Sequence, residues 1–279
     1  MSMQLYHSVC SSISKQITLS YSTSFSLGIK AMDKKYHEPI YCIYGFVRLA
    51  DEIVDTFHEY PKEALFQQYK EQTWQAIREG ISTNPVLHSF QAIVNKYHID
   101  QELIEAFLHS MEMDLKQKTH TNQSISEYIY GSAKVVGMMC LRIFYANDDN
   151  QYNALKPAAL KMGEAFQKVN FLRDIGNDFN DMGRTYFPDV DFNNFTQKDK
   201  EKIITSIRDD FEEAYKGVKL LHRDVQLGVY LAYNYYLELL RKIEQTKPEM
   251  LIHKRLSVAG KRKFTIAFNS WMRYKLNMV

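Results

Sequence analysis

The sequence predicts an all-helical protein, and three observations lead to this fold class. The 11 glycines and 6 prolines make up about 6% of the 279 residues, roughly half the usual share of about 12%. No segment alternates apolar and polar residues with β-branched enrichment, so no sheet is assigned. Hydrophobic residues are 45% and charged residues 24% of the chain, which are ordinary globular values. Long helices joined by few tight turns fit all three observations.

Proline and capping residues place the helix boundaries in the first half of the chain. Pro39 and Pro61 each suit the first turn of a helix, where a missing backbone N–H costs nothing. Asn84 is an expected N-cap followed by Pro85 at the first helical position, and Asp100 can cap the next helix. The predicted helices cover about residues 39–56, 61–80, 85 onward and 100–118.

Proline and capping residues also place the helix boundaries in the second half of the chain. Ser124 and Glu127 fit a capping box, in which each side chain satisfies a free backbone N–H of the first turn. Pro157 is expected in the first turn of its helix, because an interior proline would break it. Thr196 can start a long helix, and Pro248 ends a later one. The predicted helices cover about residues 124–144, 154–180, 196 onward, 224–246 and 256–276.

Charge is distributed unevenly along the chain. The net charge of +2 argues against a nucleic-acid binder. Residues 250–279 hold seven Lys and Arg and no acidic residue, while the rest holds 28 Lys and Arg against 33 Asp and Glu. The basic segment is interleaved with aromatic residues, and the sequence shows no repeats or linkers, so residues 1–279 are interpreted as one domain. The segment predicts contact with an anionic ligand or surface.

Cysteine usage and the N-terminus indicate the compartment. Cys10, Cys42 and Cys140 are widely separated and form no CxxC pair, which favours a reducing environment. The first residues show no basic region followed by an apolar one, so no signal peptide is expected. No apolar run is long enough to span a membrane. The expected location is the cytoplasm, with peripheral contact at the inner face of the membrane through the basic segment as a further option.

A polar stripe follows the helix that is expected after Pro39. Tyr44, Arg48, Asp51 and Asp55 are spaced by four, three and four residues, which places them on one face. Two carboxylates one turn apart repel each other and require Arg48 or a cation as compensation. A solvated face with an Arg–Asp pair is the simpler reading of this motif alone, since DxxxD occurs by chance about once in such a chain.

A second stripe of the same kind favours a cation site over a solvated face. Gln167, Asn170, Asp174 and Asp178 share one helical face, and Arg173 directly precedes the first aspartate. Carboxylates on two helices suit Mg²⁺, which is usually held by a few carboxylates together with substrate phosphates. Neither stripe contains His or Cys, which argues against zinc. The GxxxxGK[ST] pattern of nucleotide phosphate transfer is absent.

Five segments, in this order, resemble the squalene/phytoene synthases, which condense prenyl diphosphates head to head. The segments are Tyr21–Phe25, Arg48–Asp55, Tyr128–Gly137, Asn170–Asp178 and Arg184–Pro188. The resemblance covers most of the chain, with bacterial phytoene synthases as the most similar branch. It implies a single-domain isoprenoid-synthase helical bundle with a central apolar cavity.

The resemblance also implies roles for individual residues. The Mg²⁺ and diphosphate ligands would be Asp51, Asp55, Asp174 and Asp178, supported in catalysis by Arg48 and Tyr130. The substrate-binding residues would be Ser22, Ser24, Phe25, Tyr44, Gln167, Asn170, Arg173 and Tyr186. Mn²⁺ is the expected substitute for Mg²⁺.

Two positions depart from the family pattern. Thr23 stands where other branches often carry a basic residue, so a direct charge contact with phosphate is lost there. Lys134 stands where many relatives have a small or acidic residue. Its ammonium group is expected to extend to solvent, with phosphate binding as the alternative.

The implied reaction is the condensation of two geranylgeranyl diphosphates to 15-cis-phytoene through prephytoene diphosphate. Dehydrosqualene, presqualene diphosphate or squalene from two farnesyl diphosphates is the alternative within the family. NADPH is not expected as a cofactor, although the absence of GxGxxG is weak support. A non-catalytic assembly factor is the alternative from another class, but it would have no reason to keep four aspartates.

Overall fold

The computed structural model describes residues 2–116, 119–180, 183–253 and 255–279, and its side-chain description leaves out residues 177–180. Within these ranges every regular element is a helix, apart from an isolated bridge between Thr119 and Thr185. The α-helices are α1 (Met3–Tyr21), α2 (Thr23–Lys30), α3 (His37–Asp55), α4 (Lys62–Glu79), α5 (Pro85–Tyr97), α6 (Gln101–Lys116), α7 (Asn122–Ile129), α8 (Val135–Phe144), α9 (Asp149–Asn180), α10 (Gln197–Leu220), α11 (Arg223–Gln245), α12 (Pro248–Leu251) and α13 (Gly260–Lys275). Two 3₁₀ turns, η1 (Lys34–Tyr36) and η3 (Phe192–Asn194), and a π-helical segment, η2 (Tyr130–Lys134), complete them. The all-α prediction is confirmed.

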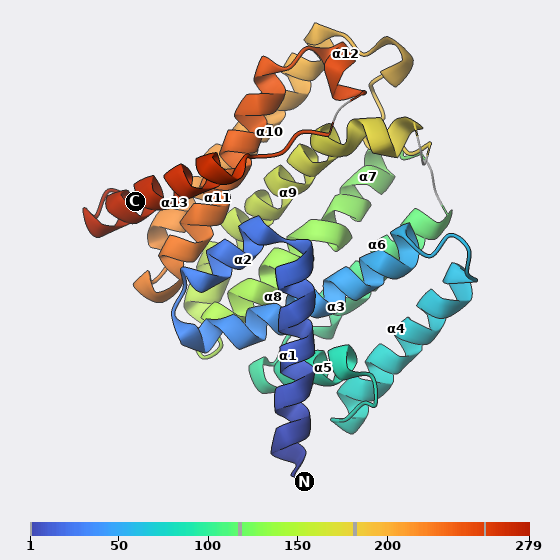
Figure 1. Cartoon of the computed structure of the whole chain (residues 1–279), viewed down its shortest axis with the longest axis vertical. Coiled ribbons are helices and arrows are strands. Elements are labelled where there is room, and N and C mark those ends of the chain that lie inside the picture. The colour runs from blue at the N-terminus through green and yellow to red at the C-terminus, as the bar shows by residue number, and fades with distance from the viewer. Residues whose placement is uncertain (1, 117–118, 181–182, 254) are drawn as a thin grey trace.

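The helices pack in two groups (Figure 1). One group places α1, α5 and α6 around α3, and the other places α10 and α11 beside the long helix α9. Helices α3 and α9 carry the two predicted aspartate stripes, and both pack against α8. The larger hydrophobic core belongs to the first group and a second core to the other. The interpretation of the chain as one domain stays a prediction.

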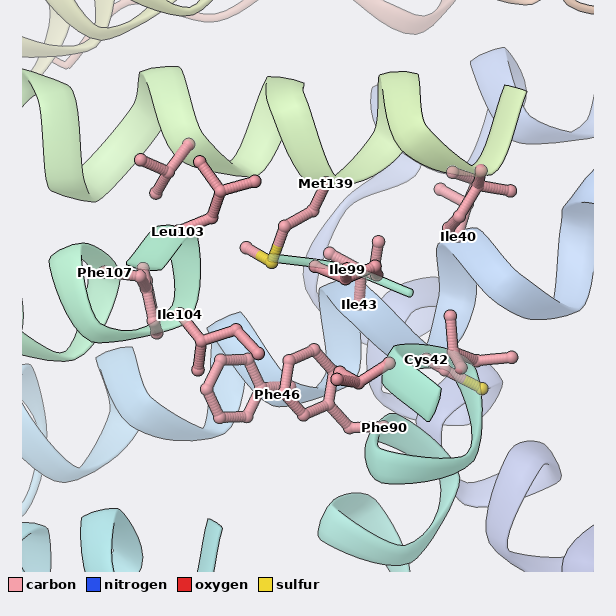
Figure 2. Close-up of a cluster of buried hydrophobic side chains, with 14 of the residues drawn as sticks. Ile40, Cys42, Ile43, Phe46, Phe90, Ile99, Leu103, Ile104, Phe107 and Met139 are labelled. Atoms are coloured by element: carbon pink, nitrogen blue, oxygen red, sulfur yellow. The ribbon is translucent and has the colours of Figure 1, made fainter. Parts of the chain in front are cut away.

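The apolar face of α3 anchors that helix in the larger core. Phe46 is fully buried and stacks on Phe90, with ring centroids 3.8 Å apart, and it also contacts Phe107 (Figure 2). Ile43 and Met139 lie in the same cluster (Figure 2). Burying one such side chain contributes about 1.5–3 kcal/mol. The core therefore fixes the rotation of α3 and leaves the face with the aspartates turned away from it.

Several boundaries lie where the capping signals predicted. The Asn84 side chain accepts hydrogen bonds from the backbone N–H groups of Val86 and Leu87, at 3.0 and 3.3 Å. Thr196 and Asp199 form a reciprocal capping box at the start of α10. Gly80 ends α4 with φ of 69°, a left-handed conformation that glycine adopts without a Cβ clash.

Three boundary predictions are wrong in detail. Ser124 is the third residue of α7 and not its cap, because Thr121 takes the N-cap position and exchanges hydrogen bonds with Ser124. Helix α9 begins at Asp149, since the Asp148 side chain accepts from the N–H of Gln151 at 3.0 Å. Pro157 therefore lies in the third turn of a 32-residue helix that tolerates one missing hydrogen bond. The last helix begins at residue 260 and not at 256.

The π-helical segment η2 is a feature that the sequence did not predict. It lies between α6 and α9, and both approaches depend on glycine. A Cβ on Gly131 would lie 2.3 Å from the Ala106 carbonyl oxygen, and one on Gly163 would lie 2.8 Å from the Cα of Lys134. Inserted π turns occur frequently at functional sites. Tyr130, a predicted catalytic residue, is the first residue of this segment.

Candidate active site

The predicted stripe on α3 holds together in the structure, with one unexpected member. The Arg48 guanidinium donates to the Glu52 carboxylate, while its Nη1 lies 3.9 Å from Asp51. It also lies over the Tyr21 ring, 4.3 Å from the centroid. Sequence reasoning left Glu52 outside the site. In the structure Arg48 pairs closely with Glu52, so Asp51, at 3.9 Å from the guanidinium, is only loosely compensated.

The electrostatics of Asp51 favour a cation at this position. Burial, and then the negative charge of Asp55, raises the pKa of Asp51 to about 7. Its side chain nevertheless remains 31% exposed. A nearby cation stabilises the ionised form of such a carboxylate, because its charge offsets both the loss of hydration and the repulsion by Asp55. The Asp51–Asp55 pair therefore fits a divalent ion that prefers oxygen ligands.

Asp55, itself 41% exposed, borders a buried cluster that the sequence did not reveal. Arg184 donates to the Asp55 carboxylate at 2.8 Å and to the Asp114 backbone carbonyl at 3.1 Å. The Asp114 carboxylate accepts from the hydroxyl groups of Tyr128 at 2.7 Å and Tyr186 at 3.5 Å. Burial raises the pKa of Asp114 to about 7, although Arg184 opposes the shift. The parallel bridge between residues 119 and 185 holds the Arg184 loop in place.

A detectable signal for Asp114 did exist in the sequence. Phe107, Ser110 and Asp114 follow an i, i+3, i+7 spacing, and all three are buried in the structure. An acidic residue on the apolar face of a helix indicates a buried partner. The carboxylate accepts from the hydroxyl groups of Tyr128 and Tyr186, and the charged residue beside it, Arg184, lies 70 residues away, so these partners could not be read from that pattern.

Aromatic stacking joins this cluster to α9. The Tyr186 ring stacks on Phe171, with centroids 4.1 Å apart, and lies 5.3 Å from the Tyr128 ring. Phe171 directly follows Asn170 on α9 and is buried. Tyr186, a predicted substrate-binding residue, is itself buried, with its hydroxyl directed at Asp114. The stacked rings therefore place the cluster of Asp114 and Arg184 beside Asn170, in the middle of the stripe on α9.

The amide part of the stripe on α9 forms a short hydrogen-bonded chain. Gln167 donates to the Ser132 hydroxyl of η2 at 3.2 Å, and Asn170 donates to the Gln167 amide oxygen at 3.3 Å. The Oδ1 atom of Asn170 is buried without a hydrogen-bond partner. A buried acceptor of this kind costs free energy until a donor or cation reaches it. The predicted role of Asn170 is substrate binding, and that role stays a prediction; its free acceptor oxygen suits a cation.

Asp174 is held by two arginines. Arg173 contacts both carboxylate oxygens, at 2.9 and 2.5 Å, and Arg255 donates from the basic C-terminal segment at 2.6 Å. The segment can come this close because Gly176 has no Cβ. A Cβ at that position would lie 2.5 Å from the Ile252 carbonyl oxygen. Arg255 was not predicted as a site residue. The side chain of Asp178 lies outside the described residues.

The N-terminal motif meets both α3 and α13. Ser22 caps α2 by accepting from the Phe25 N–H at 3.2 Å, and the Phe25 and Tyr44 rings stack 5.0 Å apart. Lys263 donates to the Thr23 hydroxyl at 2.6 Å, and burial lowers the pKa of this lysine. Sequence reasoning placed no charge at Thr23, but the structure brings one there from 240 residues away. Ser24 lies in the first turn of α2.

The expectation that Lys134 extends to solvent is wrong. Its ammonium group lies 2.7 Å from the Glu164 carboxylate, and its side chain is 19% exposed. Glu164 also pairs with Lys168, which in turn contacts Asp210. The close approach of η2 and α9 forces the Lys134 side chain along α9 rather than outward. Met138 and Met139 are fully buried in the larger core.

The donor set fits Mg²⁺ better than a soft metal. The candidate ligands are carboxylate and amide oxygens, which Mg²⁺ prefers. Among the described residues no three His, Cys, Asp or Glu side chains already converge on one point. Asp51 and Asp55 offer a charged pair, Asn170 offers a free acceptor, and Asp174 offers a carboxylate that Arg173 and Arg255 already contact.

An all-helical fold with aspartate stripes on two helices defines the isoprenoid-synthase class of proteins. Residues 19–262 match the model of the squalene/phytoene synthase family. The chain therefore belongs to the squalene/phytoene synthase family, and the predicted resemblance to prenyltransferase-type enzymes is confirmed.

Individual relatives agree with this assignment. The 15-cis-phytoene synthase of Synechocystis sp. is 26% identical over 94% of this chain and 84% of its own length. The presqualene diphosphate synthase of Sinorhizobium fredii is 30% identical over 65% of this chain and 64% of its own length. The crystal structure of a ligand-bound dehydrosqualene synthase matches with a TM-score of 0.80 and 22% identity over 98% of both chains. The last comparison shows the fold alone.

Proposed function

We propose that the protein joins two geranylgeranyl diphosphates head to head to form 15-cis-phytoene, in a reaction that depends on Mg²⁺. The observation that carries the proposal is the Asp51–Asp55 pair, in which burial and mutual repulsion raise the pKa of Asp51 to about 7. Such a pair is unfavourable without a cation. The similarity to a cyanobacterial 15-cis-phytoene synthase supports the choice of substrate.

The aspartates and the arginines have separate tasks. Asp51, Asp55 and Asp174, with Asp178 as the fourth residue, would hold the metal. The bound metal would supply Lewis-acid stabilisation of the leaving diphosphate. Arg173 and Arg255 lie on Asp174 and are placed to exchange that carboxylate for phosphate oxygens.

The described side chains also orient the substrates. Ser22 and Ser24 offer hydroxyl groups at the start of α2, and Lys263 adds a positive charge beside them. Tyr44 stacks on Phe25 and fixes the first turn of α2 against α3. Diphosphate held at this junction would direct its prenyl chain away from the charged residues.

The proposed chemistry begins with loss of diphosphate from one substrate, which leaves an allylic cation. The double bond of the second substrate attacks this cation, and loss of a proton gives the cyclopropylcarbinyl intermediate, prephytoene diphosphate. Loss of its diphosphate, rearrangement and loss of a second proton give the hydrocarbon. Two diphosphates and two protons leave in total, so no reductant such as NADPH is consumed.

The cation requires surroundings that exclude water and stabilise positive charge. The aromatic stack of Tyr128, Phe171 and Tyr186 lies directly behind the aspartate cluster. Aromatic faces attract cations, and closely stacked rings leave no space for ordered water. In this proposal Tyr130, 40% exposed at the start of η2, is the hydroxyl group that reaches the reacting carbon atoms.

Condensation of two farnesyl diphosphates is the second candidate. The structural match with a dehydrosqualene synthase and the sequence match with a presqualene diphosphate synthase favour it. Both candidates begin with the same metal-dependent condensation and differ in the length of the prenyl chain. In the shorter-chain reaction the product also depends on whether it stops at presqualene diphosphate and on whether a reductant is used, as squalene requires.

Product analysis tests the proposal. The purified protein is incubated with Mg²⁺ and each prenyl diphosphate in turn, with and without NADPH, and the hydrocarbon is identified by mass. A forty-carbon product without NADPH supports phytoene synthesis, whereas a thirty-carbon product overturns the substrate assignment. If diphosphate release with Mg²⁺ does not exceed the background measured with EDTA, a non-catalytic assembly factor is favoured.

A further inference from the structure

Helix α13 presents its apolar side chains to solvent. Phe264, Phe268, Trp271 and Met272 are 76%, 51%, 47% and 42% exposed. Their i, i+4, i+7, i+8 spacing forms one continuous stripe, which in a globular protein normally faces the core. These four residues are called the outer stripe of α13. Figure 1 shows the helix at the edge of the molecule, against α11.

The opposite face of α13 makes the contacts that hold the helix in place. Ile266 and Ser270 are buried, and the Ser270 hydroxyl accepts from the Asn234 side chain of α11 at 3.1 Å. The Tyr235 hydroxyl donates to the Lys263 carbonyl at 3.0 Å. The helix is therefore anchored through a mixed polar face while its larger apolar residues remain outside. Contiguous exposed apolar surface of this kind marks an interaction site.

The charges around the outer stripe identify the partner. Lys261 and Lys275 lie on the same side of the helix, and both are exposed. Residues 250–279 contain no acidic side chain, so nothing on this segment repels an anionic surface. An amphipathic helix with aromatic residues on one face and lysines at its edges is typical of a helix that lies in a membrane interface. A second copy of the chain would bring these lysines together and is disfavoured.

We propose that α13 docks on an anionic lipid bilayer through its outer stripe, with Lys261 and Lys275 contacting the headgroups. Contact is peripheral, since no helix in the described ranges has an 18-residue stretch apolar enough to cross a bilayer. Binding of α13 to a bilayer does not require catalysis. The purpose of this binding rests on the proposed function, because prenyl diphosphates and the hydrocarbon product both partition into membranes.

The position of α13 connects the membrane with the candidate site. Lys263 in its first turn contacts Thr23, and Arg255 in the preceding segment contacts Asp174. The membrane-facing helix and the cations of the site therefore belong to one stretch of twenty or so residues. Docking through the outer stripe places the site beside the headgroups, where the diphosphate of a membrane-bound substrate lies.

Tryptophan fluorescence tests docking directly. The chain has two tryptophans, so Trp74→Phe leaves Trp271 of the outer stripe as the only reporter. We expect a blue shift with vesicles of phosphatidylglycerol, quenching by lipids brominated on their acyl chains, and a much smaller effect with phosphatidylcholine alone. Unchanged emission with all vesicles would overturn the proposal. An equal response to both lipids would refute the role of the lysines.

Co-sedimentation with the same vesicles separates the two components of the surface. Phe264→Ser with Phe268→Ser should weaken binding at least tenfold, and Lys261→Gln with Lys275→Gln should weaken it about fivefold per lysine. Ile81→Ser and Lys96→Gln, at exposed positions on other helices and loops, are matched controls that should bind as the wild type does. Controls that lose binding to the same degree would contradict the assignment to α13.

Two further measurements keep this proposal separate from the enzymatic one. Analytical ultracentrifugation of the wild type and the Phe264→Ser, Phe268→Ser variant should show the same oligomeric state. A dimer that the substitutions abolish, without lipid binding, would show instead that the stripe is a protein interface. With substrate dispersed in detergent, the variant should keep wild-type activity, whereas failure of the proposed function would leave both proteins inactive.

Discussion

Replacing Glu164 by glutamine is expected to destabilise the protein, because this carboxylate holds η2 against α9. Its oxygens lie 2.7 Å from Lys134, 2.8 Å from Lys168 and 3.5 Å from Lys161. Its side chain is only 17% exposed. Glutamine keeps the shape but removes a carboxylate charge from all three ammonium groups, while Asp210 still pairs with Lys161 and Lys168.

The pKa of Glu164 gives the size of the effect. Burial acts to raise this pKa, but hydrogen bonds from Lys134 and Lys168 overcome it and lower the value to about 2, from the ordinary 4.5. One pKa unit corresponds to about 1.4 kcal/mol, so the ionised carboxylate contributes about 3 kcal/mol to stability at neutral pH. Loss of one partner from a buried ion pair costs a similar amount, about 3–5 kcal/mol.

The pH dependence has a definite sign. Because the folded-state pKa is lowered, the contribution is complete above pH 4.5 and is lost as the pH falls toward 2. Urea unfolding at pH 7 should therefore show a difference of about 3 kcal/mol between wild type and Glu164→Gln. That difference should shrink as the pH falls below 4.5. In thermal unfolding it corresponds to about 5 °C for a chain of this length.

Glu213→Gln is the matched control. Glu213 also pairs with a lysine, Lys216, at 2.6 Å, but both side chains are more than half exposed. Exposed pairs contribute about 0–1 kcal/mol, so this variant should unfold almost as the wild type does. A loss below about 1 kcal/mol for Glu164→Gln at pH 7, or a loss that does not change with pH, would refute the reasoning.

Three further predictions concern the candidate site. Asp51→Asn and Asp174→Asn should each lose at least about 100-fold in diphosphate release, since each removes a proposed metal ligand. Circular dichroism should show an intact fold, and Asp51→Asn should unfold at a higher temperature because it removes a buried charge. Arg255→Gln should lower the Mg²⁺ concentration for half-maximal activity by at most about fivefold, since an exposed arginine no longer competes for Asp174. Arg184→Gln should destabilise the fold by about 3 kcal/mol in urea unfolding, because Asp114 loses its buried cation.

Each of these three predictions has a result that would contradict it. Wild-type turnover by either asparagine variant would move the metal site elsewhere. An increase in the Mg²⁺ requirement of Arg255→Gln would show that the arginine assists the metal rather than competing with it. A loss below about 1 kcal/mol for Arg184→Gln would mean that the aspartate cluster is protonated and needs no cation.

The helix boundaries that the sequence predicted correctly depend on neighbouring residues. Asn84 caps α5 and Thr196 caps α10 through atoms two or three residues away, so the local pattern was sufficient. The boundaries that it predicted wrongly depend on competition between neighbours, as where Asp148 captures the start of α9 and leaves Pro157 inside. The π turn at Tyr130 follows from tertiary packing of η2 between two helices, which no local rule contains.

In the candidate site too, the sequence predicted what depends on neighbouring residues and missed what depends on tertiary contacts. The spacing of Asp51 and Asp55 predicted a shared helical face, and the structure shows their charges interacting. Helical periodicity cannot predict that Arg184 reaches Asp55 across 129 residues or that Arg255 reaches Asp174 across 81. The basic composition of residues 250–279 predicted an anionic contact near that end, and in the structure its first anionic partner is a carboxylate of the protein itself.

The contacts of Arg255 and Lys263 fit a C-terminal segment without acidic residues. The two cations reach opposite parts of the candidate site, one at Asp174 on α9 and the other at Thr23 on α2. An acidic neighbour would pair with either cation and withdraw it from the site. The outer stripe of α13 imposes the same requirement from the other side, because an anionic bilayer would repel a carboxylate there. The two faces of one short segment therefore select the same composition for different reasons, and a carboxylate introduced at Lys261 should impair lipid binding before it affects turnover.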